Sequence, residues 1–360
     1  MKGVDDMRGF SKSCGLDAFK QSGLLDFYQD HKRELFLGIR NNYINIYFQG
    51  MNIAKCKPKF KTCQIAAKYC GKEGDYLDVT PDYIIDHYEG IKNRVKEFRS
   101  YRVEDAAQQQ LILSNNCNRQ SAWYCLDVKY LVERPMKRQN LNKNAIFDIL
   151  AISRKPMDGR YCFALIELKV GTEAYDSFPK QFTKLYRANA DQMQEKIRNF
   201  TFPESHSRDV RKTIDKEFPA SLGSGILGHL YDFECYYRRG HADQTRREIV
   251  KLIDDYKYLG VLEAGDFSQL SMDTLQEKPE IYFLTIGLEK TTITARELMR
   301  RCLENGPGSH EFNAEHVLGV KWKNLKIAEE RALVEDNFLF TTRKCGEIND
   351  ILNGHETGLA

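Results

Sequence analysis

The sequence predicts a mixed α/β fold in which helices cover both faces of a central sheet. Three strand-like runs follow one another closely, at about 123–132, 145–153 and 161–170, and the last two are apolar on both faces apart from a few charged residues. Such runs are typical of central strands that are buried on both sides. Helical patterns precede and follow them, at about 103–114 and 178–197.

The N-terminal part of the chain predicts further strands. Residues 34–39 and 43–48 alternate with a period of two, and Arg40-Asn41-Asn42 supplies the turn between them. A lysine then stands at every second position from Lys55 to Lys61, so on a strand these four side chains would share one face. We favour a solvated edge over a phosphate-binding strip for this stretch. Pro81, preceded by Thr80, begins an amphipathic helix that extends to Phe98.

The order of these patterns divides the chain into three regions. We expect an N-terminal β-rich region at 1–74, a core at 75–290 with a helical insertion at about 204–262, and a C-terminal α/β region at 291–360. The core would include a late buried strand at 280–287. The C-terminal region would hold a helix near 295–304 and strands at 316–322 and 337–342.

Bulk composition narrows the class of protein without identifying it. The 360 residues are 42% hydrophobic and 29% charged, as in a globular protein, and no apolar run reaches the length of about 18 residues that a membrane helix needs. The start, MKGVDDMRGF, is acidic where a secretory signal would be apolar, so we expect a cytoplasmic protein without a membrane partner. A net charge of +3 neither supports nor excludes nucleic acid. The ten cysteines lack CxxC spacing, which favours reduced thiols over a zinc site.

Three charged residues interrupt the apolar strands. Asp148 lies in AIFDILAIS, and Glu167 and Lys169 lie in FALIELKV. Buried charges are rare unless they are paired or bind a metal. A symmetric loop centred between Met157 and Asp158 would place Asp148 opposite Glu167 on antiparallel strands, with their Cβ atoms about 5 Å apart and Lys169 on the same face. A bulge would shift this pairing.

Two carboxylates at that separation repel each other unless a cation lies between them, and oxygen ligands suit Mg²⁺ or Mn²⁺. Such a cation can hold a phosphate oxygen and lower the pKa of a water molecule, while a lysine orients the nucleophile. We therefore expect phosphodiester hydrolysis.

The pattern of Asp148, eighteen intervening residues and then Glu167-Leu168-Lys169 resembles the PD-(D/E)xK nuclease signature. The resemblance covers about 103–287, in the family order of helix, three-strand meander, helix and strand. It implies a restriction-endonuclease-like core with a central mixed sheet flanked by helices. It also implies that Asp148 and Glu167 bind the metal and that Lys169 is the catalytic lysine. Phe147 stands where the family name has proline.

The resemblance implies further site residues. The backbone carbonyl of Leu168 would complete the metal site, Glu104 would be the acid of the first core helix, and Gln181 would be the glutamine of the helix after the ExK strand. A basic loop between two core strands is either solvated or contacts the nucleic-acid backbone; it contains Arg134, Lys137, Arg138 and Lys143.

The expected function is a magnesium- or manganese-dependent nuclease acting on DNA rather than RNA, with a role in restriction or defence against foreign DNA and a second copy or another protein as a partner. One alternative is a catalytically inactive module with the same fold that binds nucleic acid or a protein. Another is a glycosidase that uses the carboxylate pair, although the nearby lysine and the buried strands fit it less well.

Overall fold

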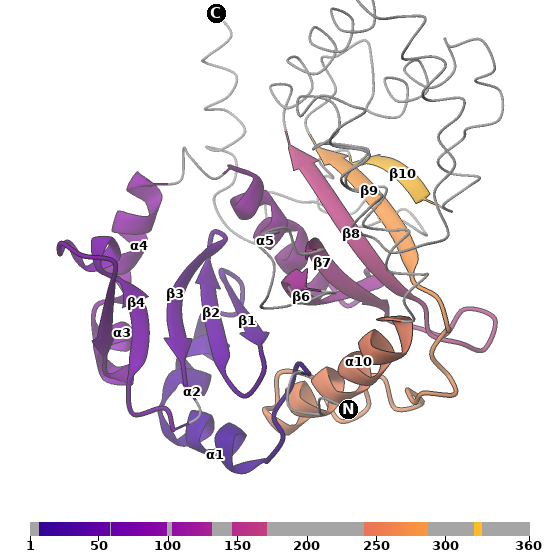
Figure 1. Cartoon of the computed structure of the whole chain (residues 1–360), viewed down its shortest axis with the longest axis horizontal. Coiled ribbons are helices and arrows are strands. Elements are labelled where there is room, and N and C mark those ends of the chain that lie inside the picture. Colours follow the sequence, from indigo (N-terminus) through magenta and orange to yellow (C-terminus); the bar gives the residue numbers. More distant parts are fainter. Residues whose placement is uncertain are drawn as a thin grey trace, which may run out of the picture.

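The computed structural model describes residues 7–57, 59–98, 103–131, 146–170, 241–286 and 320–325. These residues form a mixed α/β structure with two five-stranded sheets and several helices (Figure 1). The first sheet is antiparallel throughout, whereas the second contains both antiparallel and parallel pairs.

The first sheet has the strands in chain order, from β1 to β5. Its strands are β1 (Leu35–Ile39), β2 (Ile44–Phe48), β3 (Met51–Cys56), β4 (Cys63–Ala66) and β5 (Tyr76–Val79). The predicted turn at Arg40-Asn41-Asn42 is confirmed, since Ile39 pairs with Ile44 across it. The helices α1 (Cys14–Gln21), α2 (Leu24–Asp30), α3 (Pro81–Asp86) and α4 (Tyr88–Glu97) pack with this sheet into a shared apolar core.

Two N-terminal expectations differ from the structure. The lysines from Lys55 to Lys61 do not share a strand, because β3 ends at Cys56 and the chain turns before β4, with Phe60 in the left-handed region at φ 47°. The helix that Pro81 begins is divided at His87, where φ is −107°, so the expected single helix is α3 followed by α4. Thr80 caps the first of these helices, since its Oγ1 accepts the amide of Tyr83 at 3.2 Å.

Buried thiols meet between β3 and β4. Cys56 and Cys63 are directly opposite each other, with sulfur atoms 2.9 Å apart, and both are fully buried. The two cysteines, seven positions apart in the sequence, form a hairpin pair, and the interpretation of reduced buried thiols fits them.

The second sheet has the order β10-β9-β8-β7-β6. Its strands are β6 (Trp123–Leu131), β7 (Ile146–Ser153), β8 (Phe163–Val170), β9 (Glu280–Ile286) and β10 (Val320–Leu325). The three expected central strands form an antiparallel meander, while β9 is parallel to β8 and β10 is parallel to β9. The predicted late strand is therefore confirmed as β9, and a segment of the C-terminal region joins the same sheet.

Helices cover both faces of the second sheet. The helix α5 (Val103–Asn116) packs on one face, where Leu111 and Ile112 meet Ile149 and Ile166. The helix α10 (His241–Tyr258) packs on the other face, where Leu252 joins a different core cluster. Burial on both sides explains why β7 and β8 lack the polar face of a solvated strand.

The helix α5 also joins the two sheets, and Figure 1 shows it between them. The amide of Gln109 donates to the carbonyls of Glu34 and Tyr47 at 2.9 and 3.0 Å and accepts the amide of Gly50 at 2.6 Å. Gly50 has φ 77°, and a Cβ there would lie 2.3 Å from the carbonyl oxygen of Asp105. Only glycine fits this turn, because the helix backbone takes the space that a side chain would need.

No helix among the described residues is long and apolar enough to cross a membrane. The helices expected at 178–197 and 295–304 and the strand expected at 337–342 lie outside the described residues, as does most of the insertion at 204–262 before α10.

Candidate active site

The register of β7 and β8 puts Asp148 and Glu167 at the same level along the two adjacent strands. Paired residues run from Ile152 and Phe163 to Ile149 and Ile166, and the next level along both strands is that of Asp148 and Glu167. There the Asp148 carboxylate accepts the backbone amide of Leu168 at 2.8 Å. If the strand pairing continued, the amide of Leu168 would donate to a backbone carbonyl of β7. The carboxylate of Asp148 takes the place of that carbonyl as the acceptor, just beyond the last paired residues.

The hairpin tip differs from the symmetric loop that the sequence suggested. Met157 and Arg160 exchange backbone hydrogen bonds of 2.7 and 3.0 Å around Asp158 and Gly159, which both have positive φ. This is a two-residue hairpin turn centred one residue later than expected. Asp148 still lies level with Glu167, because the two strand ends differ in length. Three residues separate Ser153 from Met157 on one strand, and a single residue separates Arg160 from Cys162 on the other.

The ammonium of Lys129, in β6, lies between two carboxylates. Its Nζ is 3.0 Å from Asp148 Oδ1 and 3.1 Å from Asp105 Oδ1, so one cation contacts acids from β7 and α5. Burial would lower the pKa of Lys129, but the carboxylates of Asp148 and Asp105 outweigh it and raise this pKa above its ordinary value. Lys129 therefore carries its charge at neutral pH.

Both strands change face at this level. Val128 and Ile149 pack on the α5 side, whereas the next pair, Tyr130 and Phe147, packs on the α10 side. In β6 the change of face is possible because Lys129 has φ 52°, in the left-handed region. Alternation along the strand consequently does not decide the direction of Asp148, whose carboxylate reaches from the ammonium on β6 to an amide on β8.

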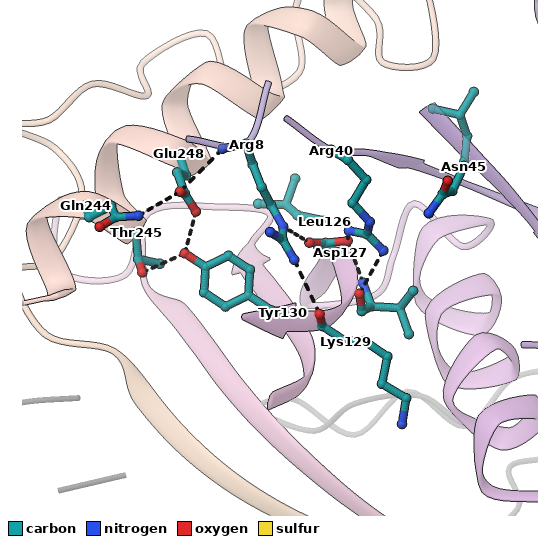
Figure 2. Close-up of polar contacts among 12 residues, drawn as sticks. Arg8, Arg40, Asn45, Leu126, Asp127, Lys129, Tyr130, Gln244, Thr245 and Glu248 are labelled. Atoms are coloured by element: carbon teal, nitrogen blue, oxygen red, sulfur yellow. Dashed lines mark hydrogen bonds and ion pairs between the residues drawn. The ribbon is translucent and has the colours of Figure 1, made fainter. Parts of the chain in front are cut away.

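A buried polar network supports β6 at the same place, as Figure 2 shows. Asp127 has a fully buried side chain that pairs with the guanidinium groups of Arg8 and Arg40. Arg40 also donates to the carbonyl of Val128 at 2.8 Å, and Arg8 donates to the carbonyl of Lys129 at 3.3 Å. Two arginines from outside the sheet thus hold the backbone carbonyls before and after the Cα of Lys129.

The network continues to α10. The hydroxyl of Tyr130 donates to Glu248 at 2.5 Å and lies 2.8 Å from that of Thr245 (Figure 2). Glu248 also accepts the backbone amide of Arg8 at 3.3 Å. The N-terminal segment, β6 and α10 are therefore tied together next to Lys129, whose ammonium points away from them in Figure 2.

Some of the predicted site residues lie close together, and others are not among the described residues. Asp148 and the buried Leu168 are in contact, and Glu167 and Lys169 occupy the expected positions along β8. The side chains of Glu167 and Lys169 are not among those described, so a shared face with Asp148 stays a prediction. Glu104 is half-buried in the first turn of α5. Five predicted residues lie outside the described part of the chain: Gln181, Arg134, Lys137, Arg138 and Lys143.

Three residues that the sequence analysis did not single out belong to this neighbourhood, namely Asp105, Asp127 and Lys129, and Gln108 follows Asp105 by three positions on α5. Asp127 carried the signal that identified Asp148, a charge inside an apolar strand. Gln108 is a fully buried polar residue on α5. Lys129 carried no signal, because a lysine on a strand is ordinarily solvated.

The donor chemistry around Lys129 suits a hard divalent cation, since carboxylate oxygens are the ligands that Mg²⁺ and Mn²⁺ prefer. Asp148 and Asp105 supply such oxygens and already hold one positive group between them. Among the described side chains no three His, Cys, Asp or Glu residues come together as a metal-binding group. The third acid in our hypothesis is Glu167, whose side chain is not among those described.

Comparison of the chain with models of known protein families, with curated proteins and with solved structures found no match.

Proposed function

We propose that the chain is a divalent-metal-dependent nuclease whose site is built from Asp148, Glu167 and Lys169. The observation that supports this most directly is the β7–β8 register, in which Asp148 is on the level of Glu167 and accepts the amide of Leu168. The sequence predicted that register from a symmetric loop between the two strands, before any contact of Asp148 was known. The coarser features of the fold, a central sheet with helices on both faces and a meander followed by a parallel strand, are compatible with the proposal.

Each residue has a defined task in this proposal. Asp148 and Glu167 hold Mg²⁺ or Mn²⁺, which supplies Lewis-acid polarisation of a phosphate oxygen when it is bound. The amide of Leu168 fixes the Asp148 carboxylate, so that one oxygen is oriented before substrate arrives. Lys169 stabilises the negative charge that develops at the reacting phosphate and orients the attacking water. Phosphodiester hydrolysis of DNA is the reaction that these groups support best, and restriction or defence against foreign DNA is the role we propose for it.

The test is cleavage of supercoiled plasmid, linear duplex, single-stranded DNA and RNA with Mg²⁺, Mn²⁺ or EDTA. Wild type should cut in the presence of either metal and should be inactive in EDTA. Asp148→Asn should lower the cleavage rate by about a hundredfold or more, because a charged ligand is lost. Asp158→Asn is the matched control, since this exposed aspartate lies at the tip of the same hairpin and its replacement should leave the rate unchanged. Equal loss in both variants, or cleavage that persists in EDTA, contradicts the proposal.

A second candidate function has one observation in its favour. The ammonium of Lys129 already neutralises Asp148 and Asp105, which would suit a module that binds nucleic acid or a protein without a metal and without catalysis. Retention of plasmid or RNA on the protein in EDTA, with no cleavage under any metal condition, would identify this function.

A further inference from the structure

Lys129 is a cation held between acids from two different elements. Asp105 lies in the first turn of α5 and Asp148 lies in β7, and the ammonium contacts both at 3.1 and 3.0 Å. The Asp148 side chain is only 7% exposed, whereas that of Lys129 is 45% exposed. The carboxylate is therefore fixed within the protein, and the lysine reaches it from the solvent side.

The backbone conformation that aims Lys129 at these acids is imposed from outside. A left-handed φ of 52° is disfavoured for a residue with a Cβ. It is held here by Arg8 and Arg40, which bind the carbonyls of Lys129 and Val128, and these arginines are held in turn by Asp127 (Figure 2). A disfavoured backbone conformation that is held by several buried contacts is typical of residues with a functional role, and we infer such a role for the side chain of Lys129.

A second, independent observation points to a ligand on the face of α5 that carries Asp105. Gln108 is fully buried, and neither its amide nitrogen nor its amide oxygen has a hydrogen-bond partner among the described residues. Gln108 follows Asp105 by three positions on α5, so the two lie on neighbouring turns of one helix face. A buried amide that can both donate and accept suits a water molecule of a hydrated cation, and Mg²⁺ usually keeps several of its waters.

We propose that Lys129 is a resident counter-ion: its ammonium holds Asp105 and Asp148 together until a divalent cation takes its place, and it then swings towards solvent. This rests on the proposed metal-dependent function and adds Asp105 and Lys129 to the site. The released ammonium lies at the edge of the metal position, where a phosphate of bound nucleic acid is its natural partner. Metal binding and phosphate binding are then coupled through one side chain, because the same charge cannot serve both carboxylates and a phosphate.

The experiment measures metal binding to the full-length chain without nucleic acid. Isothermal titration calorimetry with Mn²⁺ is compared for wild type, Lys129→Met and the control Lys155→Met, an exposed lysine of the β7–β8 hairpin. Lys129→Met should bind Mn²⁺ at least about tenfold more tightly than wild type, because a competing charge within a few ångström shifts such equilibria by about 1 to 3 pK units. Lys155→Met should bind like wild type. Equal affinity of Lys129→Met and wild type, or no binding to either, overturns the inference.

A second measurement uses wild type alone and so does not depend on the folding of a variant. Acetylation of lysines by acetic anhydride is followed residue by residue by mass spectrometry, in Mn²⁺ and in EDTA. Lys129 should react several-fold faster in Mn²⁺, because its ammonium has left the carboxylates, while the reactivity of Lys155 stays constant. An unchanged reactivity of Lys129 in saturating Mn²⁺ overturns the inference.

The two proposals fail separately. If the protein cuts DNA with Mg²⁺ but Lys129 does not respond to metal, the counter-ion inference is wrong and the nuclease stands. If Lys129 responds to Mn²⁺ but no nucleic acid is cut, the counter-ion inference stands and the nuclease is wrong.

Discussion

Replacement of Asp127 by asparagine should destabilise the whole molecule, because two arginines depend on this carboxylate. The side chain of Asp127 is 0% exposed, and those of Arg8 and Arg40 are 13% and 7% exposed. Removal of one partner from a buried ion pair typically costs about 3 to 5 kcal/mol, since the remaining charge stays buried and uncompensated. Asparagine keeps one hydrogen-bond acceptor, so we expect a loss of about 3 kcal/mol for Asp127→Asn and a larger loss for Asp127→Ala.

A change of that size is readily measured. Domains are typically stable by about 5 to 15 kcal/mol, so the loss is a large fraction of the total. In urea denaturation followed by circular dichroism, with a slope of about 3 kcal/mol/M, the midpoint should fall by about 1 M. Glu263→Gln is the control, because this residue forms an exposed pair with Arg119 and its replacement should leave the midpoint in place. The reasoning is refuted if Asp127→Asn unfolds at the wild-type midpoint, or if the control shifts as far.

Three further outcomes are expected. Lys169→Met should fold normally yet cut plasmid DNA about a hundred- to a thousandfold more slowly than wild type. In the same assay, high Mn²⁺ should partly restore the cleavage rate of Asp148→Asn but not that of Lys169→Met. Burial raises the pKa of the Asp255 carboxyl above its usual 3.8, although Lys251 and the amide of Phe10 act in the opposite direction. The stability that the protonated carboxyl contributes is therefore complete below pH 3.8 and is lost as the pH rises through the raised pKa. Asp255→Asn should accordingly gain stability relative to wild type between pH 3.8 and neutrality in urea titrations; a constant difference would contradict this. Gly50→Ala should cost about 3 kcal/mol of unfolding free energy through positive φ and overlap with α5, whereas Gly159→Ala, at φ 79° with open space around it, should cost only about 1 to 2 kcal/mol.

The central strands were predictable because their signal is strong and local. Runs of apolar residues with turn residues between them define β6, β7 and β8 to within two residues. The register that puts Asp148 level with Glu167 could also be predicted, although the turn is centred on Asp158-Gly159. The unequal lengths of the two strand ends could not be predicted, since nothing in the residues Arg154 to Pro156 shows that three residues precede the turn on one strand and a single residue follows it on the other.

The contacts of the candidate site were less predictable, since they depend on where different elements meet. Glu104 and Asp105 are neighbours in sequence, and only the packing of α5 brings Asp105 to Lys129. The left-handed conformation of Lys129 has no sequence signal, because glycine or asparagine is the residue expected there. Arg8 and Arg40 come from outside the sheet, so their convergence on Asp127 is a product of tertiary structure.

The β7–β8 hairpin tip has a practical consequence for protein engineering. Asp158 and Gly159 form an exposed turn, and a Cβ on Gly159 would meet nothing within 4 Å. Exposed tips of this kind tolerate insertions, because the flanking strands keep their own hydrogen bonds. A short epitope or a fluorophore-binding peptide grafted between these two residues should leave the fold intact. Such a reporter would sit on the two strands that carry Asp148 and Glu167, so its mobility would register any separation of those strands during the nucleic-acid binding that we propose.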